Sequence, residues 1–237
     1  MNENKKNDDR LHSGHRQRLK NRALEEGLDS FSAHEVLELL LFYSMPYKDT
    51  NELAHHLVNR FGNFWGVLNA DYQDLLRVDG IGPNTASLLA LMPEFFRRYQ
   101  MDSYEERVCL SDVHQIGEYV VNLFIGQKNE TFYMICLDIL GRLNRAALIA
   151  QGTLSEVSLY PRAIMETALR YQSKNVILAH NHPGGNMRPS SDDIQLTAHI
   201  VSVLNGVGIK VLDHIIVHGK EYYSFVEKGV MPDLLKI

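Results

Sequence analysis

The chain has 237 residues, of which 45% are hydrophobic and 22% charged, and its formal net charge is −5. This composition is ordinary for a soluble globular protein, and the length is sufficient for one large or two small domains. No apolar run approaches the length of a membrane span, the first residues lack a secretory signal, and two isolated cysteines provide no disulfide framework. The sequence therefore predicts a cytoplasmic protein with no membrane partner.

Residues 1–105 are predicted to form a small all-helical domain. The spacing Ser32-x-x-Glu35 is that of a capping box and precedes one apolar helical run, while Gly62 ends a second run. The character of the sequence then changes near residue 105. The segment 102–106 is the expected linker to a second domain, residues 106–237.

A segment similar to a helix-hairpin-helix lies within the helical domain. Gly80-Ile-Gly82 separates two helical runs, and amides at the start of the second helix can bind a DNA phosphate. A purely structural hairpin is the competing interpretation, because Pro83 removes a donor and no basic residue follows it. The domain carries 12 Lys+Arg against 16 Asp+Glu, a net charge of −4, whereas DNA-binding domains are normally basic. Gly80 and Gly82, with Arg16 and Arg18, are therefore candidates only for a weak DNA contact.

The second domain alternates between strand and helix patterns. Strands are expected over residues 131–139, 146–152, 176–180, 209–217 and 221–226, and helices over residues 112–126, 161–173 and 191–205. This order predicts an α/β domain in which helices flank a mixed sheet.

The segment 175–193 is the most informative part of the chain. A short apolar run, typical of a buried strand, leads into His180 and His182, and Pro183-Gly-Gly follows. Because side chains two residues apart on a strand point to the same side, both imidazoles should converge at one strand end. Ser190 or Ser191 can begin the next helix, which places Asp193 in its first turn.

His180, His182 and Asp193 together would supply three protein ligands, the number that leaves a catalytic zinc ion an open position for water. The spacing Ser190-x-x-Asp193 is also that of a capping box, so the aspartate could instead serve only the helix N-terminus. A zinc deaminase is disfavoured because the later Pro-Cys-x-x-Cys is absent. His214 and His218, in a later apolar strand, are expected to be hydrogen-bonded structural residues.

His180-x-His182, seven residues, Ser190, two residues and Asp193 resemble the JAMM (MPN+) metalloprotease signature. Further segments are similar to the RadC family, a bacterial branch of that group: Gly14-His-Arg-Gln-Arg-Leu19, Gly152-Thr-Leu, Tyr160-Pro-Arg162, His180-Asn-His-Pro-Gly184 and Asp213-His214. The resemblance implies a JAMM-like (cytidine-deaminase-like) mixed sheet and Zn²⁺ bound by His180, His182 and Asp193. It also implies hydrolysis of peptide or isopeptide bonds in a protein or peptide substrate.

The same resemblance implies a glutamate that acts as the general base and precedes the histidines. Glu130, at the head of the expected strand 131–139, matches that residue, with Glu156 and Glu166 as rivals. Ser190 matches the residue that hydrogen-bonds the oxyanion. Ala163 departs from the family pattern, because many RadC-type sequences have glutamate after Pro-Arg. If that carboxylate supports catalysis, activity here is weakened or altered.

A second hypothesis belongs to another functional class. The chain would be a DNA repair or recombination accessory protein, in which the helical domain contacts DNA and the metal site is not catalytic. The hairpin and the name of the family, which links it to DNA repair, favour this hypothesis. The acidic balance of residues 1–105 disfavours it.

Overall fold

A computed structural model describes residues 3–104, 108–110, 112–152 and 161–231. The chain divides into two compact units, Met1–Phe95 and Phe96–Ile237. The expected domain junction at residues 105 and 106 lies outside the described residues. None of the helices within the described ranges is long and apolar enough to cross a membrane.

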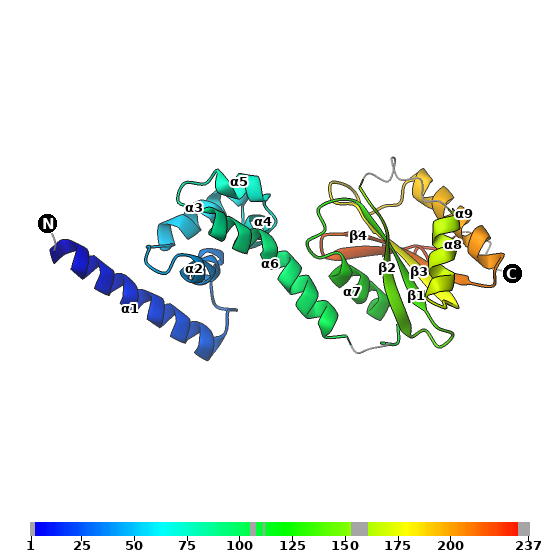
Figure 1. Cartoon of the computed structure of the whole chain (residues 1–237), viewed down its shortest axis with the longest axis horizontal. Coiled ribbons are helices and arrows are strands. Elements are labelled where there is room, and N and C mark those ends of the chain that lie inside the picture. Colours follow the sequence, from blue (N-terminus) through cyan, green and yellow to red (C-terminus); the bar gives the residue numbers. More distant parts are fainter. Residues whose placement is uncertain (1–2, 105–107, 111, 153–160, 232–237) are drawn as a thin grey trace. The chain divides into compact units, whose positions relative to one another are not determined.

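The N-terminal unit is helical, as the sequence predicts. Its elements are α1 (Glu3–Glu26), α2 (Ala33–Ser44), α3 (Asn51–Phe61), α4 (Phe64–Leu68), α5 (Tyr72–Leu76) and the first half of α6 (Pro83–Asp102) (Figure 1). Fully buried leucines at positions 37, 41, 57, 75 and 89 form the centre of its core. The capping interaction before α2 is present, because the Ser32 amide donates to Glu35 Oε2 at 2.9 Å.

The C-terminal unit is an α/β layer structure built on five strands. Its elements are α7 (Val113–Leu123), β1 (Thr131–Leu137), β2 (Leu143–Gln151), α8 (Pro161–Arg170), β3 (Asn175–Asn181), α9 (Ser191–Asn205), β4 (Lys210–His218) and β5 (Glu221–Ser224). The strand order is β2-β1-β3-β4-β5. Among the described strands, β3 and β4 pair in parallel and the other neighbours are antiparallel, so the sheet is mixed, as predicted.

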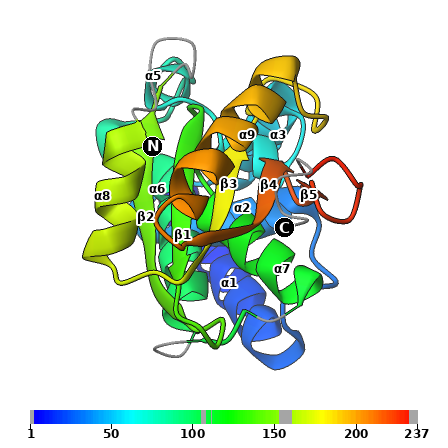
Figure 2. The same cartoon turned by 90° about the vertical axis from the view of Figure 1, so that its right-hand side faces the viewer.

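The alternation of side chains along the central strands creates two cores, one on each face of the sheet. Helix α7 covers one face of the sheet, and α8 and α9 cover the other (Figures 1 and 2). Tyr133 and Ile135 of β1 pack with α7, whereas Val176 and Leu178 of β3 pack with α8 and α9. His180 continues the series of Val176 and Leu178 with period two. Its imidazole therefore lies on the α9 side of the sheet.

Candidate metal centre

His180, His182 and Asp193 converge on one point. Each offers one ligand atom, and these three atoms lie within 4.8 Å of one another. The two Nε2 atoms are 2.9 Å apart, and His180 Nε2 is 3.1 Å from Asp193 Oδ1. His182 Nε2 lies 3.7 Å from Asp193 Oδ2. The residues that the sequence motif singles out thus form a single compact cluster.

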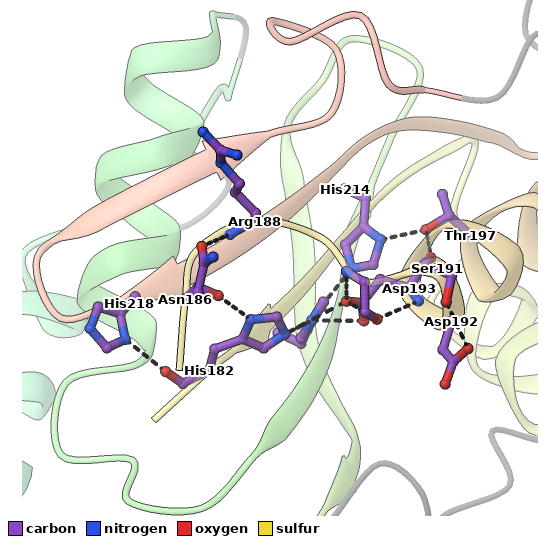
Figure 3. A network of polar contacts seen from close by, with 11 residues as sticks. His182, Asn186, Arg188, Ser191, Asp192, Asp193, Thr197, His214 and His218 are labelled. Carbon is purple, nitrogen blue, oxygen red and sulfur yellow. Dashed lines mark hydrogen bonds and ion pairs between the residues drawn. The ribbon is translucent and has the colours of Figure 1, made fainter. Parts of the chain in front are cut away.

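The local structure explains this convergence. His180 is the last residue but one of β3, and His182 follows the strand, although its amide still donates to Val217 O of β4 at 2.9 Å. The parallel pairing of β3 with β4 therefore continues past the end of β3, so the two histidines keep the same orientation. The chain then turns at Pro183 and begins α9 after Ser190, which brings the first turn of the helix back over the strand end (Figure 3).

Asp193 has two tasks at once. Its Oδ2 accepts hydrogen bonds from the Ser190 amide at 2.8 Å and from Ser190 Oγ at 2.6 Å, while the Asp193 amide donates to Ser190 Oγ at 3.1 Å. Its Oδ1 faces His180. The capping interpretation and the metal-ligand interpretation are therefore compatible, because each uses a different oxygen of one carboxylate.

The charge states of the cluster suit a cation. The His180 side chain has 0% exposure, and this burial lowers its pKa, so the imidazole is neutral at pH 7. Burial alone would raise the pKa of Asp193, but the contact with His180 and the hydrogen bonds from Ser190 outweigh burial and hold that pKa well below its ordinary value. The His182 side chain is 15% exposed. An ionised carboxylate and a neutral imidazole thus meet in a largely buried position.

His182 presents its Nε2 lone pair to the same point. Its Nδ1 lies 2.7 Å from the main-chain oxygen of Asn186. A carbonyl oxygen only accepts, so the proton is on Nδ1 and the lone pair is on Nε2. Metal-ligating histidines usually have such a partner for their second nitrogen. His218 is exposed and donates from Nδ1 to the main-chain oxygen of His182 at 2.8 Å.

Glu130 lies at the head of the strand that borders the histidines. β1 pairs with β3 in antiparallel orientation, with Phe132 opposite His180, and the Thr131 amide donates to Asn181 Oδ1 at 2.7 Å. Glu130 directly precedes β1 and lies two residues before Phe132, and alternation continued by one residue beyond the strand predicts that it shares the face of His180. The charge of Glu130 acts on His180, where it partly opposes the stronger lowering of the pKa by burial.

Of the rival carboxylates, Glu166 is engaged in an ion pair on another element. Glu166 lies on α8, where its half-exposed carboxylate pairs with Arg162 Nε at 2.7 Å. Glu156 lies outside the described residues. Ala163, the departure from the RadC pattern, is exposed in the first turn of α8.

The candidate nucleic-acid residues lie in the N-terminal unit. Gly80 has a φ of 88°, and Gly80 and Gly82 border a pocket together with residues 44–48 and 83–85. Arg16 contacts the same 44–48 loop, because its guanidinium donates to the main-chain oxygens of residues 45, 46 and 48. It also lies 4.6 Å from the ring centre of Phe42. Arg16 thus stabilises the end of α2, whereas Arg18 is exposed on α1.

The sequence interpretation did not identify Thr197 as part of this site. Thr197 follows Asp193 by one helical turn, is fully buried, and contacts His214 Nδ1 at 2.6 Å (Figure 3). The spacing Asp193-x-x-x-Thr197 is a usable signal, because residues four apart on a helix share a face.

A mixed sheet of this topology, with a His-His-Asp cluster at the end of its central strand, defines a domain of the JAB/MPN type. Residues 110–230 match the family model described as the RadC-like JAB domain. The UPF0758 protein FN0909 of Fusobacterium nucleatum subsp. nucleatum is 34% identical over 225 residues, which cover 92% of this chain and 97% of that protein. The UPF0758 protein HEAR2468 of Herminiimonas arsenicoxydans is 33% identical over 213 residues, with coverages of 90% and 95%. The chain belongs to the RadC family, as the resemblance of its motifs predicted.

The buried histidines predict how the stability of the metal-free protein depends on pH. Burial lowers the pKa of His180 and of His214 in the folded state, so the unfolded state binds more protons below a pH of about 6.5. The free energy of unfolding is therefore highest above that pH. At lower pH it decreases by about 1.4 kcal/mol per pH unit for each histidine that stays neutral in the folded state. Because the pKa of Asp193 is lowered, its own contribution is lost only below about pH 3.8.

Urea unfolding of the full chain in EDTA, at pH 7.5 and 5.5, tests this expectation. Far-UV circular dichroism follows both units, and fluorescence of Trp65, the single tryptophan, reports separately on the N-terminal unit. The transition seen by dichroism but not by Trp65 should move to lower urea at pH 5.5. An unchanged or higher midpoint for that transition would contradict the burial argument.

Proposed function

We propose that this protein is a zinc-dependent hydrolase, a metallopeptidase that cleaves peptide or isopeptide bonds in a protein or peptide substrate. The observation that carries the proposal is the meeting of two imidazole nitrogens and one ionised carboxylate at the end of β3. Membership of a JAB-domain family supports metal-dependent hydrolysis as the reaction class.

The donor set fits zinc. His180 and His182 would bind through Nε2 and Asp193 through Oδ1, a nitrogen and oxygen set of three protein ligands that is typical of catalytic rather than structural zinc. Neither described cysteine belongs to the cluster, so a thiolate site is not involved. Bound zinc polarises a carbonyl oxygen and lowers the pKa of a water molecule toward about 7.

Glu130 is the proposed general base. It would accept the proton of the attacking water and return it to the leaving amine. The position of Glu130 directly before β1, two residues from Phe132, which pairs with His180, supports this role. The negative charge of Glu130 also acts on His180.

Ser190 is the proposed donor to the oxyanion, an effect typically worth about 10²–10³ in rate. In the structure its hydroxyl donates to Asp193 Oδ2, so it must turn to reach a substrate oxygen. The Ser190 amide holds the same Oδ2 at 2.8 Å independently of the hydroxyl. The capping of α9 can therefore persist while the hydroxyl serves the substrate.

Metal analysis of the purified full chain tests the site. We expect one zinc ion per chain, and hydrolysis of a panel of peptide and isopeptide substrates that stops with a chelator and returns with Zn²⁺. Asp193→Asn should lose the metal because it removes the only charged ligand. The matched control is Asp192→Asn, a change at the exposed neighbour in the same helical turn. Equal zinc content in both variants, or no zinc in the wild type, would refute the site.

The role of Glu130 has its own test. Glu130→Gln should retain zinc, because all three ligands remain, and should lose about 10²–10⁴ of the hydrolytic rate. Glu166→Gln, at the exposed partner of Arg162, is the control and should keep full activity. Full activity in Glu130→Gln would show that another group is the base, and Glu156 would then be examined.

DNA contact by the N-terminal unit is a separate proposal, and we expect it to be weak. Main-chain carbonyl oxygens accept hydrogen bonds from Arg16, whereas Arg18 is exposed and is the better candidate for a phosphate contact. Fluorescence anisotropy of the full chain with duplex DNA should show a shallow dependence on salt, which reflects few phosphate contacts. Arg18→Ala should weaken that binding and Arg162→Ala, in the other unit, should not. Nanomolar affinity in moderate salt would instead favour the DNA repair hypothesis.

A further inference from the structure

Behind the candidate ligands, a chain of buried hydrogen bonds connects three elements. His214, fully buried on β4, places Nε2 2.8 Å from His180 Nδ1 and Nδ1 2.6 Å from Thr197 Oγ1. Thr197 in turn donates to the main-chain oxygen of Asp193 at 2.5 Å. Because Asp193 Oδ1 faces His180, the contacts form a closed ring of four residues (Figure 3).

The directions of these hydrogen bonds follow from the last group in the series, the main-chain carbonyl of Asp193. The carbonyl oxygen of Asp193 only accepts, so the Thr197 hydroxyl proton points to it, and Thr197 Oγ1 is left as an acceptor. His214 therefore donates from Nδ1, and its Nε2 accepts. His180 must then donate from Nδ1, which leaves the lone pair of its Nε2 directed at Asp193 and His182.

We propose that Thr197 and His214 are positioning residues that fix the tautomer of His180, and that this fixed tautomer makes the site competent for a divalent cation. The proposal rests on the metal-dependent function proposed above and extends it to two residues that do not touch the metal. Without this chain of contacts, His180 can carry its proton on Nε2, which places an N–H where a ligand lone pair is required.

The two histidines are held by different means. His182 relies on one main-chain oxygen, that of Asn186, which no side-chain substitution removes. His180 relies on two side chains, so its tautomer can be altered without changing any ligand. Thr197 is suited to this test, since valine has nearly the same shape and lacks only the hydroxyl.

The first experiment compares zinc affinities of full-length variants by competition with a chromophoric chelator. Thr197→Val should bind zinc about 10–100-fold more weakly than wild type, the usual effect of removing an outer-shell partner. Thr197→Ser restores the hydroxyl and should restore the affinity. Thr167→Val is the matched control, because Thr167 donates to a main-chain oxygen four residues earlier on α8, Ala163 O at 2.7 Å. It should bind zinc as wild type does.

A second measurement detects the tautomer itself. Long-range ¹H–¹⁵N correlation spectra of the metal-free, histidine-labelled full chain should show His180 protonated on Nδ1 in wild type and at least partly on Nε2 in Thr197→Val. His214→Gln retains an acceptor for His180 and should lose less affinity than His214→Met, which does not.

The outcomes separate the two proposals. If wild type binds no zinc, the metal function fails, while the spectra still decide the tautomer of His180. If wild type and Thr197→Val bind zinc equally and His180 keeps the same tautomer in both, the positioning role is wrong and the metal site stands. A proton on Nε2 of His180 in the wild type would also refute the positioning role.

Discussion

The geometry at the end of β3 depends on the carboxylate of Asp193. One oxygen fixes where α9 begins, through the amide and hydroxyl of Ser190, and the other faces the imidazole of His180. A helix start is commonly specified by side-chain hydrogen bonds of this kind to the first backbone amides. Here the same side chain sets the helix start and completes the cluster, so the position of the helix and the geometry of the site are specified together.

The register of the sheet is the second constraint. Phe132 lies opposite His180 on β1, and Ile216 lies beside it on β4. Since side chains alternate, a slip of one residue would turn His180 toward the α7 face and away from Asp193. The fully buried run from Val176 to Ala179, packed on both faces, disfavours such a slip, because it would exchange the contents of two well-packed cores.

Local signals account for what the sequence predicted well. The helix expected over residues 191–205 is α9 with the same bounds, because its serine cap and its apolar spacing both lie within the segment. Other features depend on distant partners. β2 begins at Leu143, three residues before the expected strand, since Leu143 and the polar Arg145 join it through main-chain pairing with Leu137 and Cys136 of β1. The long, charged α1 lies within the region predicted to be helical, but its sequence has no apolar periodicity from which its bounds could be predicted.

The residues of the site likewise differ in whether local signals or distant partners determine their positions. The convergence of His180, His182 and Asp193 is encoded by short spacings within one segment, whereas the contact of His180 with His214 and Thr197 joins three elements that only the folded sheet brings together. Glu130 is intermediate, because its place beside the histidines depends on the pairing of β1 with β3.

The turn after His182 has room for side chains but a constrained length. A side chain at Gly184 would meet no atom within 4 Å, and one at Gly185 would only touch His182 Cβ at 3.9 Å. A small side chain at Gly184 would therefore fit without repacking. The length of the loop is constrained, because the Asn186 oxygen must reach His182 and Ser190 must begin α9. Side chains at these two glycines would thus leave the site in place, whereas insertions or deletions in the loop would separate the histidines from the aspartate.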